Sequence, residues 1–170
     1  TRPIWTNAMD EVKGVDGKYY TSNHATIWRW REAYQHDFAA RLDWSHQPKF
    51  KGANHHPLVN VNGDRSRNPI FLTAAPGAPV TLDASATSDP DGDEFSFHWY
   101  PYREAGSFPL TIHYRNLKWQ GDQTAVLKLN APATNAPATI HFILEVRDRG
   151  QPSLTSYRRV ILKVDPTYKD

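Results

Sequence analysis

Apolar and polar residues alternate along several short stretches in the second half of the chain. The alternation is clearest over residues 95–100, where Phe95, Phe97 and Trp99 are separated by less apolar positions, and over residues 140–147. Residues 80–84, 124–129 and 160–164 follow the same pattern, and clusters rich in Asp, Asn, Pro and Ser separate the runs. A period of two is typical of strands with one buried face. The pattern therefore predicts a mainly β, antiparallel sandwich over residues 69–170, with Trp99 in its core.

Residues 1–50 follow a different pattern, which predicts a helix-containing extension. Between Ala25 and Leu42, apolar residues recur every three or four positions, at Ile27, Trp30, Tyr34, Phe38 and Leu42. This spacing places them on one helical face, which needs a partner to bury it. We expect that partner to be either the sandwich or a domain outside this chain. Residues 51–68 read as a turn-rich connector, in which residues 58–61 are a candidate for a short first strand.

Composition excludes several classes of protein. Lys and Arg total 20 against 18 Asp and Glu, a formal net charge of +2, so neither nucleic acid nor an anionic membrane is an expected partner. No apolar run approaches the length of a membrane span. The absence of Cys excludes a disulfide scaffold, thiol catalysis and Cys-ligated zinc. The chain begins at Thr1 rather than Met, so we expect a fragment or a processed product.

One stretch resembles a known family of sandwich domains. Residues 77–99 read Gly-Ala-Pro-Val-Thr-Leu-Asp-Ala-Ser-Ala-Thr-Ser-Asp-Pro-Asp-Gly-Asp-Glu-Phe-Ser-Phe-His-Trp, and this is similar to the polycystic kidney disease (PKD) type of immunoglobulin-like domain. The segment from Leu144 to Gly150, Leu-Glu-Val-Arg-Asp-Arg-Gly, resembles the penultimate strand and turn of the same domains. The resemblance implies an immunoglobulin-like fold for about the last hundred residues and says little about a ligand.

A second resemblance covers the whole chain. Residues 25–44, together with Asn54-His-His-Pro57, Val61-Asn-Gly-Asp64 and Tyr102-Arg-Glu-Ala-Gly106, are similar to landmarks of a bacterial family of cellulose-binding proteins. In that family a nucleoside-hydrolase-like domain precedes an immunoglobulin-like domain. The resemblance implies that this chain is the C-terminal portion of such a protein, that residues 1–50 are the tail of the hydrolase-like domain, and that the protein is secreted or periplasmic.

The turn from Asp89 to Asp93 is the candidate metal site. Asp89, Asp91 and Asp93 place three carboxylates at alternate positions, and calcium takes several oxygen ligands from tight turns. The alternative is a solvated turn in which the Asp side chains bind their own backbone. His55 and His56 are adjacent and would point in opposite directions in an extended segment, so we expect a structural role for them rather than a metal site.

Exposed aromatic rings are the candidates for binding a sugar, because the C–H faces of sugars lie flat against them. The candidate binding residues are Tyr100, Tyr102, Tyr114, Trp119 and Trp28. The alternative is that packing between the helix and the sandwich buries these rings. A glycosidase would need two carboxylates facing each other across a cleft, for which the sequence gives no spacing. For Glu104 we expect a structural role, accepting hydrogen bonds from backbone amides.

The leading hypothesis is therefore a non-catalytic domain that binds a cellulose-type polysaccharide within a larger secreted protein. Its expected partners are the polysaccharide and an upstream hydrolase-like domain of the same protein, and its expected cofactors are none, with calcium as the candidate ion. One alternative is a structural spacer or lid that stabilises the hydrolase-like domain and contributes Trp28, Arg29 or Arg31 to the surface of that domain. The other is enzymatic, with this chain supplying part of a composite active site that depends on the region from Trp28 to Arg31.

Overall fold

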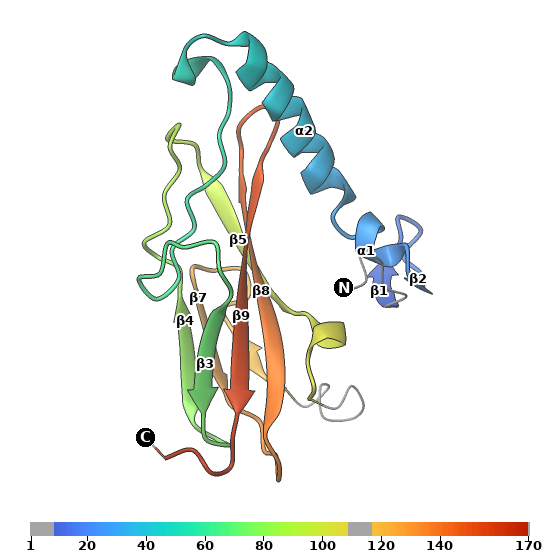
Figure 1. The fold of residues 1–170 in the computed structure, drawn as a ribbon, viewed down its shortest axis with the longest axis vertical. Helices are drawn as coiled ribbons and strands as arrows, with labels where there is room; N and C mark the ends of the chain where they lie inside the picture. The colour runs from blue at the N-terminus through green and yellow to red at the C-terminus, as the bar shows by residue number, and fades with distance from the viewer. Residues whose placement is uncertain (1–8, 109–116, 170) are drawn as a thin grey trace, which may run out of the picture.

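The second half of the chain folds into two facing β-sheets (Figure 1). The computed structural model describes residues 9–108 and 117–169. One sheet contains, in spatial order, β3 (Ile70–Ala74), β9 (Thr155–Val164), β8 (Ala138–Asp148) and β5 (Phe95–Pro101). The other contains β4 (Pro79–Asp83), β7 (Val126–Asn130) and β6 (Trp119–Gln120). This arrangement confirms the mainly β, immunoglobulin-like sandwich that the alternating pattern predicts.

One strand pair departs from the antiparallel prediction. The pairs β5–β8, β8–β9, β4–β7 and β6–β7 are antiparallel, but β3 runs parallel to β9, with Ile70 opposite Val160. The chain passes to the other sheet directly after β3, so no hairpin forces an antiparallel neighbour on this strand. The expectation of a purely antiparallel sandwich is therefore wrong at this edge.

The connector contributes to the sandwich although it forms no extended strand. The candidate strand at residues 58–61 is reduced to isolated bridges, from Leu58 to Ser88 and from Val61 to Asp64. Val61 is nevertheless fully buried in the core. The strands β3 and β6 were not expected from the alternating pattern.

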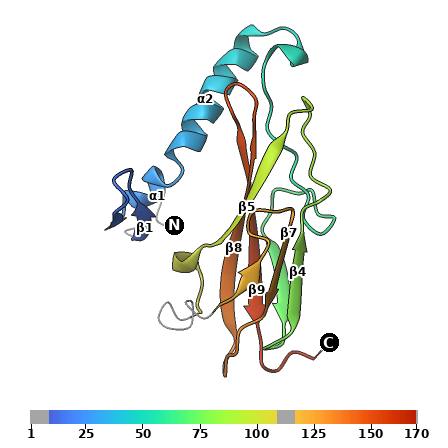
Figure 2. The ribbon, with the colours of Figure 1, turned by 180° about the vertical axis from the view of Figure 1, so that it is seen from behind.

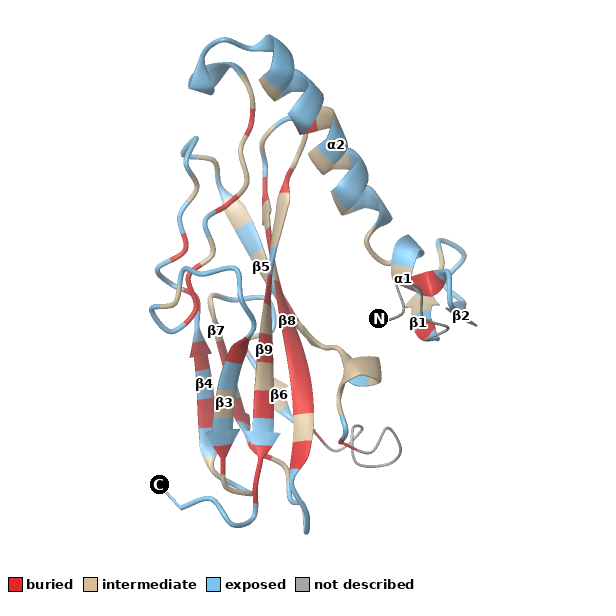
Figure 3. Cartoon of the chain, in the orientation of Figure 1, coloured by how far each residue is buried: buried red, intermediate tan, exposed pale blue. Residues whose placement is uncertain are grey.

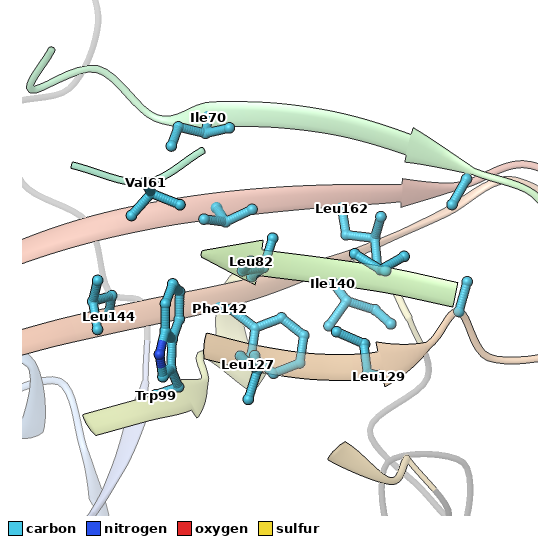
Figure 4. Packing of buried hydrophobic residues seen from close by; sticks show 14 of the residues in the cluster. Val61, Ile70, Leu82, Trp99, Leu127, Leu129, Ile140, Phe142, Leu144 and Leu162 are labelled. Carbon is cyan, nitrogen blue, oxygen red and sulfur yellow. The ribbon is translucent and has the colours of Figure 1, made fainter. Parts of the chain in front are cut away.

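The core lies between the two sheets and is built from the inward-facing positions of both (Figure 4). Trp99 of β5 is only 1% exposed, as its alternation predicts, and its Nε1 donates to the backbone oxygen of Thr124 at 3.1 Å. Leu82, Leu127, Phe142 and Leu144 surround it from both sheets. A contiguous apolar interior of this kind supplies most of the stability of a domain without disulfides.

The extension consists of a hairpin and two helices. The strands β1 (Asp10–Lys13) and β2 (Tyr19–Ser22) pair antiparallel, and α1 (Ala25–Trp28) and α2 (Arg31–His46) follow. One continuous helix was expected over residues 25–42, but the helix breaks at Arg29 and Trp30, whose side chains both turn toward the sandwich. Short 3₁₀ turns, η1 (Phe50–Gly52) and η2 (Arg103–Ala105), lie in the connector and after β5.

The helix α2 runs past the end of the β8–β9 hairpin, and the β1–β2 hairpin with α1 lies to one side of the sandwich (Figures 1 and 2). Among the described residues, no helix combines the length and the apolar character that crossing a membrane requires. The extension therefore forms an arm beside the sheet, and the contacts at the base of this arm define the site described next.

Candidate functional site

The outer face of the four-stranded sheet carries the predicted ring Tyr100. Because Trp99 faces the core, its neighbours His98 and Tyr100 face outward. The strand register continues these positions across the sheet: His98 lies opposite Glu145, which lies opposite Tyr157. The sheet thus presents a mixed aromatic and charged outer face to the extension.

Trp30 covers this aromatic surface. Its ring centroid lies 5.0 Å from that of Tyr157 and 6.4 Å from those of both Tyr100 and Tyr102. The contacts to Tyr157 and Tyr102 are edge-to-face, the geometry that aromatic pairs favour. Burial, followed by the nearby Glu145 charge, raises the pKa of the Tyr100 and Tyr157 hydroxyls. These rings therefore join the extension to the sandwich.

Arg29 ties the hairpin, the helix and the η2 turn together. Its guanidinium contacts Glu104 Oε1 at 2.7 Å, lies 3.7 Å from Asp10 Oδ2, and donates to the backbone oxygen of Glu11. The guanidinium also lies 4.9 Å from the centre of the Tyr102 ring, within the range of a cation–π contact. Three segments that are distant in sequence thus meet at one cation.

The carboxylates around Arg29 are held by several hydrogen bonds. Glu104 Oε1 accepts the backbone N–H of Glu11 at 3.1 Å, which confirms the expected structural role of Glu104. Burial by itself raises the pKa of Glu104, but the hydrogen bonds and the Arg29 charge outweigh burial and lower it overall. Tyr102 donates its hydroxyl to Asp10 Oδ2 at 3.0 Å, and burial together with this bond raises the pKa of Tyr102 to about 12. Glu104 is therefore ionised and paired with Arg29 near neutral pH.

A second set of contacts holds α2 against the β8–β9 hairpin. His36 Nδ1 lies 2.8 Å from the backbone oxygen of Ser153, and Arg147 donates to Glu32. Between the helix and the sheet lies a polar hollow of about 80 Å³. That volume suits a few water molecules and is smaller than the pockets that usually hold organic ligands.

The adjacent histidines of the connector, His55 and His56, contact different side chains. His55 stacks between Phe50 and Trp44, with centroid distances of 3.7 and 5.6 Å, and its Nδ1 lies 3.2 Å from the Asp91 carboxylate. His56 Nε2 lies 2.8 Å from Asp37 Oδ1 on α2. The two rings therefore have separate partners, in agreement with the structural role expected for them.

The aspartate turn binds its own backbone. Asp89 Oδ1 accepts the N–H groups of Asp91 at 2.9 Å and Asp93 at 3.1 Å. The carboxylate of Asp91 accepts the backbone N–H of His55 at 2.7 Å. Burial and the neighbouring carboxylates Asp89, Asp148 and Asp91 raise the pKa of Asp93. Within residues 9–108 and 117–169, no group of three or more His, Cys, Asp or Glu side chains is arranged to hold a metal ion. Calcium at this turn stays a prediction.

The predicted sugar-binding rings do not form one exposed row. Tyr100 and Tyr102 are half-buried beneath Trp30, and Trp119 packs edge-on against Phe142 in the core, so the expectation that these three are exposed is wrong. Trp28 is 44% exposed and contacts His24. Tyr114 lies outside the described residues. A role of these rings in sugar binding stays a prediction.

The sequence did not indicate which residues would join the extension to the sandwich. Arg29 and Glu104 lie 75 positions apart, and no periodic pattern pairs them. Of the five residues on the predicted aromatic face of the helix, only Trp30 reaches the sandwich, while Ile27, Tyr34, Phe38 and Leu42 are exposed. Of the two partners expected for this face, the sandwich therefore covers only Trp30, and for the other four residues a domain outside this chain stays a prediction.

Comparison with known proteins extends the resemblance drawn from the sequence. The chain is similar to the solved structure of a nucleoside hydrolase-related hypothetical protein from Saccharophagus degradans that is associated with carbohydrate metabolism. The two share 34% sequence identity with a TM-score of 0.78, over 92% of this chain and 40% of the other. This chain thus spans less than half of that protein.

A PKD domain from the KIAA 1837 protein, solved in solution, has 21% identity and a TM-score of 0.38, over 62% of this chain and 90% of the other. No curated protein matches the chain. The family model for the C-terminal domain of cellulose-binding protein Sde0182 matches residues 79–164, which include β4 to β9. The chain therefore belongs to the family of the Sde0182 cellulose-binding protein C-terminal domain.

Proposed function

We propose that this chain is a non-catalytic accessory domain of a carbohydrate-directed protein, and that it holds a nucleoside hydrolase-related domain in a fixed position. The observation that carries the proposal is the joint made by Arg29 and Trp30. It locks the helical arm onto the sandwich through one half-buried cation and three aromatic contacts. Because the arm is fixed to the sandwich, a domain that binds the arm is also held in a fixed position relative to the sandwich.

The state of the carboxylates supports a non-catalytic role. Catalytic acids and bases need access to substrate and a pKa suited to proton transfer. Glu104 is paired with Arg29, Asp10 accepts from Tyr102, and Asp148 accepts backbone N–H groups. These acids stabilise the fold, and the hollow beside Glu145 is too small for a sugar ring and its surroundings.

Calorimetry of the full-length protein tests this function. If the accessory domain holds the hydrolase-related domain, the two unfold in one cooperative transition. A double variant, Arg29→Met with Trp30→Ala, cuts the joint and is expected to split that transition into two. The control is Arg65→Met, an exposed cation of the connector. Two independent transitions in the unaltered protein would contradict the proposal, as would glycoside or nucleoside turnover by the 170-residue chain alone.

Direct binding of a polysaccharide is a second candidate function. The name of the matched family supports it, and Trp28 offers a ring with 44% of its surface exposed. Retention of the 170-residue chain on insoluble cellulose and on a panel of soluble glycans tests it. We expect Trp28→Ala to reduce retention and Phe71→Ala, which removes an exposed ring of β3, to leave it unchanged. No retention of the unaltered chain on any glycan would reject this candidate.

A further inference from the structure

Both helices of the arm carry large apolar residues that the described chain leaves exposed. Ile27, Tyr34, Phe38 and Leu42 are between 45% and 64% exposed, although all are large and apolar. Single exposed apolar residues are ordinary, but a group on one face marks an interaction surface. We name this group the outer face of the arm. In Figure 3, most of the ribbon of α2 is coloured as exposed, and Ala40 is the one buried residue of this helix.

The helix α2 has two separate contact faces. Its inner face meets the sandwich and connector through Glu32, His36, Asp37 and the fully buried Ala40. At 3.6 residues per turn, Tyr34, Phe38 and Leu42 lie roughly 180° around the helix axis from the mean direction of the inner-face residues. The sandwich therefore cannot also cover the outer face. A helix that is held on one side by polar contacts and carries exposed apolar residues on the other side has a face free for a second body.

The outer face has the form of a protein-binding surface. A shallow, open depression lies along α2 and is bordered by five residues of this one helix, Tyr34, Gln35, Asp37, Phe38 and Arg41. At its rim, Arg41 and Asp37 form an ion pair at 2.8 Å, four residues apart on the helix. An apolar centre bordered by charged groups is the common arrangement of an interface between folded domains.

We propose that the outer face of the arm is the docking surface for the nucleoside hydrolase-related domain of the full-length protein. This proposal rests on the proposed function and names the surface through which it acts. The similar protein from Saccharophagus degradans contains the equivalent of 92% of this chain within only 40% of its own length. The remainder of that protein is joined to the same polypeptide, and such a linkage raises its effective concentration at the arm above that of any separate partner.

Hydroxyl-radical footprinting compares the full-length protein with the 170-residue chain, which contains its own buried core. The measurement is the labelling rate of Phe38 and Tyr34. We expect labelling of Phe38 to be roughly fivefold lower in the full-length protein, because docking removes most of its 64% exposure. Phe71, 73% exposed on β3, is the internal reference and is expected to label equally in both samples.

A charge variant tests the same surface. Phe38→Glu in the full-length protein is expected to raise labelling of Tyr34 to the rate of the 170-residue chain, and the matched Phe71→Glu is expected to leave it low. Equal labelling of Phe38 in the full-length protein and the shorter chain would overturn the proposal. Protection that appears in the 170-residue chain only as its concentration rises would also overturn it, since a second copy would then be the occupant.

The two proposals fail in different ways. If Phe38 is protected in the full-length protein but calorimetry shows independent transitions, the outer face is a docking surface and the proposed function is wrong. If the transition is cooperative and Phe38 stays fully labelled, the accessory role stands and a different surface carries the contact.

Discussion

Arg29 and Glu104 form an ion pair at 2.7 Å in which the Arg side chain is 16% and the Glu side chain 22% exposed. The pair connects the segment between α1 and α2, which contains Arg29, to the η2 turn that follows β5. Exposed ion pairs contribute little to stability, but a mostly desolvated one is costly to break because one charge is then left without its partner. This contact therefore sets where the arm begins relative to the sandwich.

Replacing Arg29 with Met is expected to loosen the arm while the sandwich core stays folded. Met retains most of the volume but removes the hydrogen bonds to Glu104 and to the Glu11 carbonyl. The loss of charged hydrogen bonds costs about 1.5–3 kcal/mol, so amide exchange in β1 and β2 should accelerate by about tenfold or more. Hydrogen exchange of the 170-residue chain measures this.

Arg31 provides the matched control for that substitution. It lies two positions further on, is exposed, and forms no ion pair with any residue that the structure describes. Arg31→Met is therefore expected to leave exchange in β1 and β2 unchanged. Equal effects of the two substitutions would show that the ion pair does not fasten the arm.

Acid is expected to release the arm before it unfolds the sandwich. The folded pKa of Glu104 lies below its ordinary value of 4.5, so the ionised pair stabilises the folded state above that value and is lost as the pH falls through the folded pKa. The pKa values of Asp37 and Glu32 are lowered as well, by their hydrogen bonds with Arg41 and Arg147, and act in the same direction. Burial raises the pKa of Glu145, which opposes them.

Exchange rates in β1 and α1 between pH 6 and 3 measure the acid release, after correction for intrinsic exchange. We expect protection to fall below about pH 4.5 in the unaltered chain. In Glu104→Gln the arm should already be weakened at pH 6 and should depend less on pH. Constant protection down to pH 3 in the unaltered chain would rule out this role for Glu104.

Period-two alternation predicts the strands β4, β5, β7, β8 and β9, but it misses β1, β2, β3 and β6. Trp99 is buried and Tyr100 faces outward, as their positions in an alternating run require. Burial alternates along β3 as well, but its sequence hides the pattern because the apolar Phe71 stands at an exposed position between Ile70 and Leu72. The hairpin β1–β2 is polar and mostly exposed, so hydrophobic patterning could not reveal it.

The candidate site was harder to predict because its contacts join residues that are far apart in the sequence. Alternation shows that Tyr100 points away from the core but not that Trp30, seventy positions earlier, lies over it. Helical spacing groups Trp30 with Tyr34 and Phe38, yet the break at Arg29 turns only Trp30 toward the sandwich. Which face of a helix meets which body is decided by tertiary packing, which local patterns do not encode.

Asp148 is expected to be one of the most sensitive polar positions in the chain. It is 2% exposed and accepts hydrogen bonds from Asn54 Nδ2 and from the N–H groups of Gly150 and Leu154. Asp148→Ala removes the acceptor of the Gly150 and Leu154 N–H groups and one acceptor of Asn54, and should lower the free energy of unfolding by about 2–4 kcal/mol. Urea unfolding followed by tryptophan fluorescence measures it.

Glu94 is the control at the same end of the sandwich. It forms an ion pair with Arg149 at 2.8 Å, but both side chains are more than 70% exposed. Glu94→Ala should therefore change stability by no more than about 0.5 kcal/mol. If Asp148→Ala is as mild as Glu94→Ala, the buried network around Asn54 does not hold the connector in place.

Gly121 and Gly77 are expected to differ in their tolerance of a side chain. Both have positive φ angles, +84° and +81°, which favour glycine. A Cβ at Gly77 would meet nothing within 4 Å, whereas one at Gly121 would lie 2.1 Å from the backbone oxygen of Val126. The turn at Gly121 also precedes Asp122 and Thr124, whose carbonyls accept both N–H groups of Trp99.

We therefore expect Gly77→Ala to cost about 1 kcal/mol, the usual strain of a left-handed conformation, and Gly121→Ala to cost about 3 kcal/mol or more. The larger effect should come with a red-shifted Trp99 emission, because displacing the turn admits water to that ring. Urea midpoints and emission spectra of the two variants provide the comparison. Equal midpoints would mean that the backbone around Gly121 can move aside, and that this turn does not fix Trp99 in the core.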